Sequence, residues 1–374
     1  MKHSKLVMLT TGLAYGGAET QLVHLATRLK ARGWQVTVIS MLPPQAYVQE
    51  LAAMNIPVHS LNMRRGVPDP RALFHLAAIL REERPKILHS HMVHANIMAR
   101  VARALTHIPV VICTAHSVNE GGRHREWAYR LTDPLCDLTT QVSQVGMERY
   151  VRVGAVPRNK IKFVPNGVDT KLFRPDREAR ERLRAELNLH DSFVWLAVGR
   201  FEEAKDYPTL LRAYAKVAQN KPPSRLLIAG HGPLLETIKG LAARLNITSF
   251  IHFLGIRKDV SDLMNAADGF VMSSRWEGMP MVLLEAAATG LPIVATDVGG
   301  NREIVLHNQS GFLVPPAQPD ALAEAMQRLM NLPHQDRLSM GLTGREYVVQ
   351  RYDLEKIVDQ WEAIYCELLK KKQA

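Results

Sequence analysis

Two glutamates, Glu277 and Glu285, flank a segment whose residues favour the start of a helix. Pro280 suits the first turn of a helix, because the N–H that proline lacks has no partner there anyway. Gly290 suits the residue just past the helix end. Gly278 would then lie at a helix N-terminus, where free N–H groups and the positive end of the dipole favour an anion. A phosphate between two carboxylates is typical of a sugar nucleotide, because the helix end can hold the phosphates while the carboxylates accept hydroxyls.

Two cations, Arg200 and Lys205, lie in one strand-to-helix loop. The loop follows an apolar run at 193–198 and precedes a helix that Asp206 and Pro208 mark at its start. At the carboxyl edge of a parallel sheet, two such cations could clamp a diphosphate. The alternative is a pair of solvated surface charges, and the spacing alone leaves both open.

A second glycine-bearing loop, ending in Gly16 and Gly17, follows the first apolar run at 6–10. Adjacent glycines let a backbone approach a ligand closely, although a tight turn needs them equally. The loop lacks the G-x-G-x-x-G pattern, so no dinucleotide cofactor is indicated.

Histidines lie at the ends of two further apolar runs. His116 follows the run at 110–114, and His89 and His91 lie at the end of the run that starts at Ile87. In open α/β sheets ligands bind beyond the carboxyl ends of the strands, which makes His116 a functional candidate beside the structural alternative. His89 and His91, with the nearby His94, have no carboxylate or cysteine at ligand spacing, so no metal site is predicted.

These candidate residues need parallel sheets to position them, and the chain alternates strand and helix patterns in both halves. At 374 residues it suits two domains, which we expect to be doubly wound, with a boundary near residue 170. Strands are predicted at 6–10, 36–39, 57–61, 87–89, 110–114, 138–142, 162–164, 193–198, 225–229, 251–254, 269–272, 291–296 and 312–314. Helices are predicted at 18–31, 71–83, 96–105, 146–153, 177–187, 207–219, 260–267, 281–289, 320–330, 336–350 and 354–370.

Composition excludes several classes of protein. No apolar run reaches the roughly 18 residues of a membrane span, and the N-terminus enters its first strand without a signal-peptide core. The three cysteines form neither a disulfide framework nor a metal motif, which indicates a reducing cytosol. We therefore expect a cytoplasmic protein.

The net charge of +11 is concentrated in the first half, where residues 1–170 hold 21 Lys and Arg against 11 Asp and Glu. This half could face an anionic membrane surface, a lipid phosphate or nucleic acid, or could simply keep the protein soluble. Nucleic acid is not favoured, because RNA-binding aromatic motifs, zinc fingers and basic tails are missing from the sequence. The arginines proposed for an anionic surface are Arg64, Arg65, Arg71, Arg81, Arg84, Arg100, Arg103, Arg149 and Arg152.

Taken together, the chain resembles a retaining glycosyltransferase of the GT-B fold, in the large family 4 (group 1). The resemblance covers nearly the whole chain, and its most specific part is the E-x7-E motif from Glu277 to Glu285. The other segments that carry it are 16–19, 114–116, 164–169, 198–200 with Lys205, and 229–232.

The resemblance implies two Rossmann-like domains facing across a cleft. Residues 1–170 would bind the acceptor, residues 171–353 would bind the nucleotide sugar, and the helix within 354–374 would pack back on the first domain.

The resemblance also implies a role for each site residue. Arg200 and Lys205 would hold the diphosphate, Glu285 the ribose, and Gly16 with Gly17 would let the first loop reach the phosphates. His116 would contact the donor sugar. Glu277 and the following backbone would contact sugar hydroxyls, and Arg257 would lie near the base. That backbone comprises Gly278, Met279, Pro280 and Met281.

The predicted function is transfer of a hexose or N-acetylhexosamine from a nucleotide sugar to a lipid-linked or polysaccharide acceptor, with a UDP-sugar favoured over GDP-mannose. No cofactor and no metal are required, since fixed cations can stabilise the leaving diphosphate. The setting would be surface polysaccharide or glycolipid biosynthesis, with peripheral binding at the inner membrane face. The alternatives are a nucleotide-sugar epimerase or phosphorylase of the same fold, or a non-enzymatic basic binding protein. The sequence leaves the oligomeric state open.

Overall fold

The computed structural model describes residues 4–189, 192–218 and 223–373. The chain divides into two compact units, one formed by Met1–Gly167 with Leu354–Ala374 and the other by Val168–Asp353. We call them unit 1 and unit 2. The division after Gly167 lies close to the boundary expected near residue 170, and the second division precedes the last helix.

Unit 1 contains a parallel sheet that, within the described residues, has seven strands in the order β3-β2-β1-β4-β5-β6-β7. The register pairs Thr10 with His91 and His91 with Thr114, so these strand ends lie side by side at the carboxyl edge. The strands are β1 (Lys5–Thr10), β2 (Gln35–Ser40), β3 (Val58–Ser60), β4 (Ile87–His91), β5 (Val110–Ala115), β6 (Leu138–Gln141) and β7 (Ile161–Phe163).

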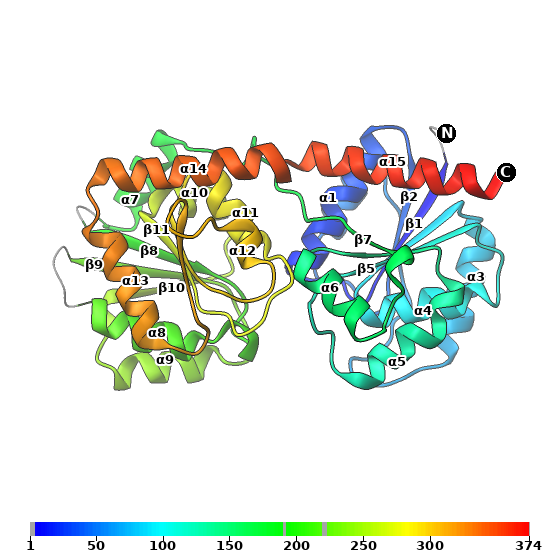
Figure 1. The fold of residues 1–374 in the computed structure, drawn as a ribbon, viewed down its shortest axis with the longest axis horizontal. Helices are drawn as coiled ribbons and strands as arrows, with labels where there is room; N and C mark the ends of the chain where they lie inside the picture. Colours follow the sequence, from blue (N-terminus) through cyan, green and yellow to red (C-terminus); the bar gives the residue numbers. More distant parts are fainter. Residues whose placement is uncertain (1–3, 190–191, 219–222, 374) are drawn as a thin grey trace. The chain divides into compact units, whose positions relative to one another are not determined.

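Helices cover both faces of this sheet (Figure 1). Helices α3 (Arg71–Glu83) and α4 (Val93–Arg103) share one apolar cluster with the sheet, and α5 (Arg123–Thr132) packs beside α4. Helices α1 (Gly17–Ala31), α2 (Val48–Ala53) and α15 (Leu354–Gln373) contribute to a cluster on the opposite face. Helix α6 (Gln144–Arg152) packs by β7, and two 3₁₀ turns complete the unit, η1 (Asp133–Leu135) and η2 (Arg158–Lys160).

Unit 2 has a second parallel sheet, with six strands among the described residues in the order β10-β9-β8-β11-β12-β13. Chain order and sheet order differ at β8, which lies between β9 and β11, so the loops after β8 and β11 emerge next to each other. The strands are β8 (Phe193–Val198), β9 (Ser224–Ala229), β10 (Ile251–Gly255), β11 (Gly269–Met272), β12 (Ile293–Thr296) and β13 (Gly311–Val314).

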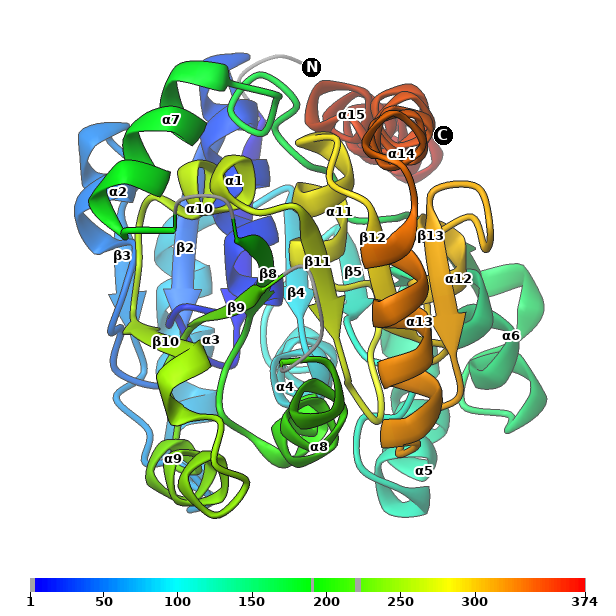
Figure 2. The ribbon, with the colours of Figure 1, turned by 90° about the vertical axis from the view of Figure 1, so that its left-hand side faces the viewer.

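Figure 2 shows helices on both faces of this second sheet. Helices α8 (Tyr207–Val217), α9 (Leu235–Arg244) and α13 (Pro319–Asn331) pack on one face. The other layer contains α7 (Arg177–Glu186) beside α10 (Val260–Ala266), and α11 (Met281–Ala288) beside α14 (His334–Tyr352). The short helices are α12 (Asn301–Ile304), η3 (Glu203–Lys205) and η4 (Thr248–Phe250).

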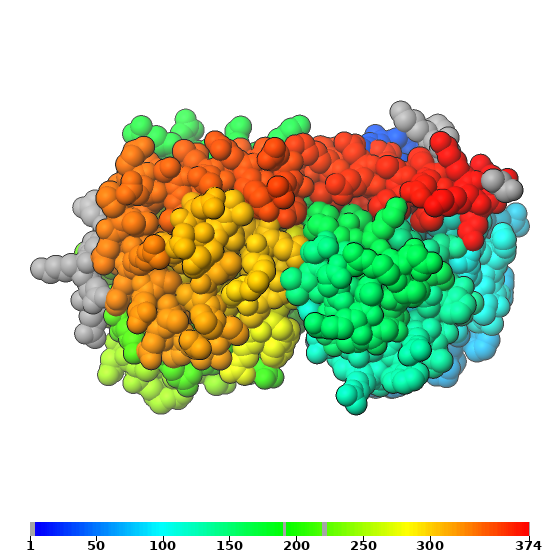
Figure 3. Space-filling model, viewed as in Figure 1, coloured from blue at the N-terminus to red at the C-terminus, as the bar shows by residue number. Residues whose placement is uncertain are grey.

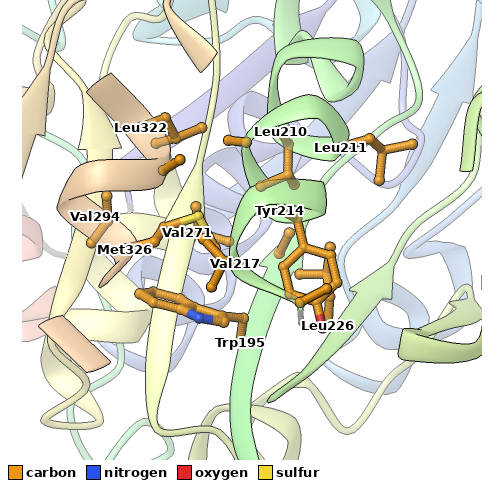
Figure 4. Packing of buried hydrophobic residues seen from close by; sticks show 14 of the residues in the cluster. Trp195, Leu210, Leu211, Tyr214, Val217, Leu226, Val271, Val294, Leu322 and Met326 are labelled. Atoms are coloured by element: carbon orange, nitrogen blue, oxygen red, sulfur yellow. The ribbon is translucent and has the colours of Figure 1, made fainter. Parts of the chain in front are cut away.

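The core of unit 2 fixes the strand that leads to the candidate site. Trp195 of β8 is fully buried among α8 and α13 side chains, including Val217 and Met326 (Figure 4). A buried apolar side chain of this size contributes roughly 1.5–3 kcal/mol or more to folding. The end of β8 is therefore held rigidly where the loop with Arg200 and Lys205 begins.

The predicted fold class of two Rossmann-like doubly wound units is confirmed, and most element ends differ by only one to three residues. Four helices were not predicted: α2, α5, α9 and α12. The predicted helix at 207–219 ends at Val217 in the structure, and Gln219 lies outside the described residues. Helix α5 buries only Tyr129, so it lacks the apolar periodicity from which helices are predicted.

One predicted surface residue is wrong. Arg100 is fully buried, and its guanidinium donates to the Tyr129 carbonyl at 2.8 Å and to Thr139 Oγ1 at 2.7 Å. It therefore holds α4 against α5 and β6 and is not available to an anionic surface. Arg103 and Arg149 are also partly buried in ion pairs, with Asp137 and Glu126 respectively.

Candidate functional site

Lys205 and Glu277, predicted to act on the donor, are in direct contact in unit 2. Lys205 Nζ lies 2.6 Å from Glu277 Oε1, and Ser274 Oγ donates to the same oxygen at 2.7 Å. Glu277 Oε2 has no hydrogen-bond partner among the residues that the structure describes. One oxygen of the carboxylate is thus fixed by two donors, while the other can accept a hydroxyl.

Hydroxyl and carboxylate groups between the loops after β8 and β11 hold this pair in place. Ser273 Oγ donates to the Lys205 carbonyl at 2.8 Å and to the Asp206 carbonyl at 3.0 Å. The Asp206 carboxylate accepts from Thr209 Oγ1 at 2.8 Å and from Arg275 Nε at 3.1 Å. Sequence reasoning missed these supports, since a serine or arginine near a site has no distinctive spacing of its own.

Arg200 lies in the same loop as Lys205 but makes a different contact. Its guanidinium pairs with Glu202 at 2.6 Å, and its Nε is buried without a hydrogen-bond partner among the described residues. Two glycines of the loop after β9 allow close packing here, because a Cβ on Gly230 would lie 1.9 Å from the Gly199 carbonyl oxygen. A Cβ on Gly232 would lie 2.6 Å from the Phe201 backbone. The loop that contains Arg200 therefore packs directly against the glycine backbone of the loop after β9.

The backbone from Gly278 to Met281 leads into α11, as the sequence predicted. Pro280 is the N-cap residue, with φ −71° and ψ 124°, and Met281 opens the helix, so the prediction that Pro280 belongs to the first turn is wrong by one residue. Extended backbone is the usual conformation of the residue before a helix, and proline's fixed φ fits it. Met279 and Met281 are buried, which fixes the segment beneath the helix N-terminus.

Gly299 supports the Glu277 backbone from the loop after β12. It has a φ of +54°, and a Cβ there would lie 2.2 Å from the Glu277 carbonyl oxygen. The next N–H, of Gly300, donates to the Gly278 carbonyl at 2.7 Å. The adjacent glycines at 299–300 could be seen in the sequence, but nothing in the sequence indicated that they pack against the backbone of Glu277 and Gly278.

Glu285 lies on α11 and is only 8% exposed. Its carboxyl group has no hydrogen bond or ion pair within the described parts of the chain, and burial raises its pKa to about 7. An unpartnered buried carboxyl group is costly, so it needs a donor from a ligand or a proton of its own. This is the environment expected of a group that accepts a ligand hydroxyl.

Arg257 is not brought together with the other predicted residues. It follows β10, which β9 separates from β8, and its Nε donates to Asp259 at 2.7 Å. That hydrogen bond raises the pKa of the guanidinium further above its usual range. A role near the base stays a prediction that no contact within the described residues of unit 2 supports.

In unit 1 the predicted histidines gather at the carboxyl edge of the sheet. His91 Nδ1 lies 3.0 Å from His116 Nε2, and His89 bonds to Tyr365 and Thr114 at 2.7 Å each. Burial lowers the pKa of His116 to about 4 and that of His89 to about 3, so both are neutral at physiological pH. Neutral imidazoles can donate or accept hydrogen bonds to a sugar, whereas charged imidazolium rings would attract an anion.

The glycine loop of unit 1 leads into α1. Gly16 is the N-cap residue in an extended conformation and Gly17 is the first helical residue. A Cβ on Gly16 would lie 2.5 Å from a carboxylate oxygen of Glu19. The glycine therefore serves the packing of its own helix start, and the contact with phosphates stays a prediction.

Two further findings concern metals and membranes. Within residues 4–189, 192–218 and 223–373, no group of three or more His, Cys, Asp or Glu side chains could hold a metal ion. None of the helices in these ranges is both long and apolar enough to cross a bilayer.

Comparison with protein families matches both halves of the chain. Residues 179–347 match the family model described as glycosyl transferases group 1, and residues 15–172 match glycosyltransferase family 4. The first matched range contains Arg200, Lys205, Glu277 and Glu285, and the second contains Gly16 and His116.

Individual relatives have different donors. The chain is 28% identical to the Escherichia coli UDP-Gal:alpha-D-GlcNAc-diphosphoundecaprenol alpha-1,3-galactosyltransferase, over 82% of this chain and 81% of that protein. It is 31% identical to a GDP-mannose-dependent alpha-(1-6)-phosphatidylinositol monomannoside mannosyltransferase of Mycobacterium tuberculosis, over 62% of this chain and 60% of that one.

A solved structure shares the fold of this chain. Anabaena HepE, in complex with UDP-glucose, superposes with a TM-score of 0.85 over 99% of this chain and all of that chain, at 22% identity. At that identity the similarity shows that the two proteins share a fold.

Proposed function

The chain belongs to the group 1 glycosyltransferases of family 4, has the GT-B fold and transfers sugar from a nucleotide sugar, and we propose a specific reaction for it. The donor is a UDP-sugar that carries a hexose or N-acetylhexosamine. The acceptor is a hydroxyl of a lipid-linked sugar or growing polysaccharide, and the anomeric configuration is retained. The setting is surface polysaccharide or glycolipid assembly at the inner membrane face.

The observation that carries the proposal is the fixed Lys205–Glu277 pair beside the N-terminal end of α11. Lys205 and the helix end supply positive charge for a diphosphate. The second oxygen of Glu277 accepts a sugar hydroxyl. Arg200 adds a further donor, since its buried Nε has no partner in the described part of the chain, and Glu285 accepts from the ribose.

The proposed chemistry needs no nucleophile from the protein. The bond between the anomeric carbon and the β-phosphate oxygen breaks, and the acceptor oxygen attacks from the same face. The acceptor proton passes to the departing phosphate. Lys205, Arg200 and the helix end stabilise the leaving charge, a role that a metal ion plays in other enzymes. We therefore propose that transfer is independent of metal ions.

Three similar proteins bear on the donor or the acceptor. UDP is favoured because the E. coli relative uses UDP-Gal and HepE binds UDP-glucose, while GDP-mannose is the donor of the mycobacterial relative. The E. coli relative acts on a sugar linked to diphosphoundecaprenol, which supports a lipid-linked acceptor.

A thermal-shift panel of nucleotides and nucleotide sugars, with and without EDTA, tests the donor proposal. A ligand at 100 times its Kd stabilises the folded state by about 2.7 kcal/mol. We expect a UDP-sugar to raise the melting temperature equally with EDTA and to lose this effect in Arg200→Ala. A shift with GDP-mannose alone would replace the donor, and a shift abolished by EDTA would contradict the metal-free proposal.

Product analysis separates transfer from the other reactions possible on this fold. Incubation of the donor without acceptor should leave the sugar nucleotide unchanged over the time in which transfer to a lipid-linked acceptor is complete. An epimerised sugar, or a sugar phosphate formed with inorganic phosphate, would overturn the transferase proposal.

A further inference from the structure

Helix α5 of unit 1 exposes apolar side chains that a soluble surface normally covers. Trp127 is 57% exposed and Leu131, one turn later, is 73% exposed. Tyr129 is the buried residue of this helix and anchors it through hydrogen bonds from Asn96 and to Glu120. Large apolar side chains clustered on one helix face mark a surface that binds something.

Exposed arginines surround these side chains. Arg123 and Arg130 lie on α5 and Arg152 lies at the end of α6, and none of them has an ion pair among the described residues. The Arg130 guanidinium lies 5.4 Å from the centre of the Trp127 ring. The nearby acid, Glu126, already pairs with Arg149. The apolar cluster is therefore rimmed by cations without counter-charges.

The end of α6 continues this surface. Val153 and Gly154 line a groove together with Arg123, Trp127, Arg130 and Glu126, the acid that pairs with Arg149. Figure 3 shows the segment from α5 to α6, coloured teal to green, on the face of unit 1 toward the viewer. We call this the α5 surface, and it consists of Arg123, Trp127, Arg130, Leu131, Arg152 and Val153.

We propose that the α5 surface docks on an anionic lipid bilayer. Tryptophan is favoured at the membrane–water interface, and arginines near it attract anionic headgroups. A short helix that presents both can lie in the plane of the interface with its apolar side chains inserted. The inference rests on the proposed function only in that a membrane presents the lipid-linked acceptor.

The charge of the whole unit favours the same partner. Unit 1 holds 25 Lys and Arg against 14 Asp and Glu, whereas unit 2 holds 22 of each. The positive excess of the chain thus belongs to the unit with the exposed tryptophan. The general field brings the unit to an anionic surface, and the α5 surface supplies the specific contact.

Vesicle flotation of the full chain tests the docking. We expect binding to phosphatidylglycerol-containing vesicles and at least tenfold weaker binding to pure phosphatidylcholine. The double variant Trp127→Ser with Leu131→Ser should lose at least tenfold in binding, and so should the triple variant Arg123→Ser, Arg130→Ser and Arg152→Ser. The matched control is Leu338→Ser with Leu342→Ser on α14 of unit 2, also exposed and one turn apart, which should bind as the parent does.

Tryptophan fluorescence locates the contact directly. Of the five tryptophans, Trp127 and Trp276 are exposed, while Trp34, Trp195 and Trp361 are buried. Lipids brominated on their acyl chains should quench the parent, and this quenching should disappear in Trp127→Phe and persist in Trp276→Phe. Quenching retained in Trp127→Phe would overturn the proposal.

Two other results would also overturn it. One is equal binding of the parent protein to anionic and neutral vesicles. The other is a parent dimer in analytical ultracentrifugation that the Trp127→Ser with Leu131→Ser variant loses, because a second copy would then cover the surface. Donor-dependent thermal shifts are measured on the same variants. If a variant no longer binds vesicles but still shows the donor-induced thermal shift, only the docking surface is affected and the proposed donor chemistry is retained. If the parent itself shows no donor-induced shift, the proposed donor chemistry is wrong, whatever the result for docking.

Discussion

The carboxyl edges of the two sheets use the same fold for opposite electrostatic purposes. In unit 2 the loops after β8 and β11 bring Lys205 and Glu277 into contact. Arg200 Nε is buried there with no hydrogen-bond partner among the described residues. In unit 1 the ends of β4 and β5 bring His91 and His116 together, and burial keeps both neutral by lowering the pKa of each. One edge has fixed charge ready for a diphosphate, while the other has uncharged hydrogen-bonding groups.

The difference shows what a parallel sheet decides and what it leaves open. Strand order places loop ends together, but side-chain desolvation determines whether the groups there are charged. Glycines and hydroxyls hold the charged edge of unit 2, through Gly299 against the Glu277 backbone and Ser273 against the Lys205 carbonyl. Aromatic packing holds the neutral edge of unit 1, where His89 lies 4.5 Å from Trp361, measured between ring centres.

Removing the cation from the charged edge should have the largest effect. We expect Lys205→Ala to reduce kcat/KM for transfer by about 10²–10³-fold, the usual cost of losing one group that stabilises developing charge. Lys216→Ala, an exposed lysine of the same unit paired with Asp320, is the control and should stay near the parent. Initial rates with radiolabelled donor measure this, and a loss below threefold in Lys205→Ala would break the comparison.

Disturbing the backbone of that edge should have the next largest effect. Gly299→Ala and Gly255→Ala both put a side chain at positive φ, of +54° and +66°, but a Cβ meets nothing within 4 Å at Gly255. Both should lose about 1 kcal/mol of stability in urea unfolding from the left-handed backbone. Gly299→Ala should lose more than Gly255→Ala, because its Cβ would overlap the Glu277 carbonyl oxygen. We expect Gly299→Ala alone to lose activity, roughly tenfold or more, because it displaces Glu277. Equal activities would show that this close packing is unimportant.

The pH dependence of nucleotide-sugar binding should show a smaller effect, due to Glu285, at the charged edge of unit 2. Its raised pKa means that the folded free protein holds a proton up to about pH 7, while the unfolded chain releases it near 4.5. Stability from this group is therefore present below 4.5 and is lost as pH rises toward 7. A ribose hydroxyl favours the carboxylate, so nucleotide-sugar affinity should rise by up to about tenfold from pH 6 to 8. Calorimetry should find no such rise in Glu285→Gln, and an unchanged rise would reject the assignment.

The neutral edge should show no titration at all in the physiological range. Because the pKa of His116 is lowered to about 4, its imidazole should stay uncharged from pH 5.5 to 8. Proton NMR of the ring, assigned by comparison with His116→Gln, should find constant shifts over this range. A midpoint near 6.5 would mean that the edge is solvated and would remove the contrast.

The sequence predicted both sheets and the loops that contain Lys205 and Glu277, because alternating elements and strand ends follow from local patterns. The sequence did not predict the ion pair between these two residues, and only the family resemblance assigned both of them to one donor. The sequence did not predict which nearby carboxylates would pair with the cations of the site. Arg200 pairs with Glu202 and Arg257 with Asp259, each only two residues away, and such pairing depends on backbone geometry. Electrostatic roles inferred from spacing are therefore less secure than the positions of the loops.

Two errors in unit 1 have a common physical origin. Arg100 was predicted at the surface because it is charged, yet acceptors from Tyr129 and Thr139 satisfy it inside. Helix α5 was not predicted because Trp127 and Leu131 face outward. In both cases residue type alone predicts the wrong burial: the charged residue is inside and the apolar residues are exposed. Only tertiary contacts determine this.

Unit 1 is discontinuous in the chain, since α15 follows the whole of unit 2 and completes the core of unit 1 with Ile357, Trp361 and Tyr365. During synthesis the ribosome therefore delivers every residue of unit 2 before the last part of unit 1 exists. Unit 2 can fold first although it is translated second, while the early segment waits with an open apolar face. Helix α15 covers that face once it has been synthesised, and Arg32 holds the helix there through ion pairs with Glu355, Asp359 and Glu362.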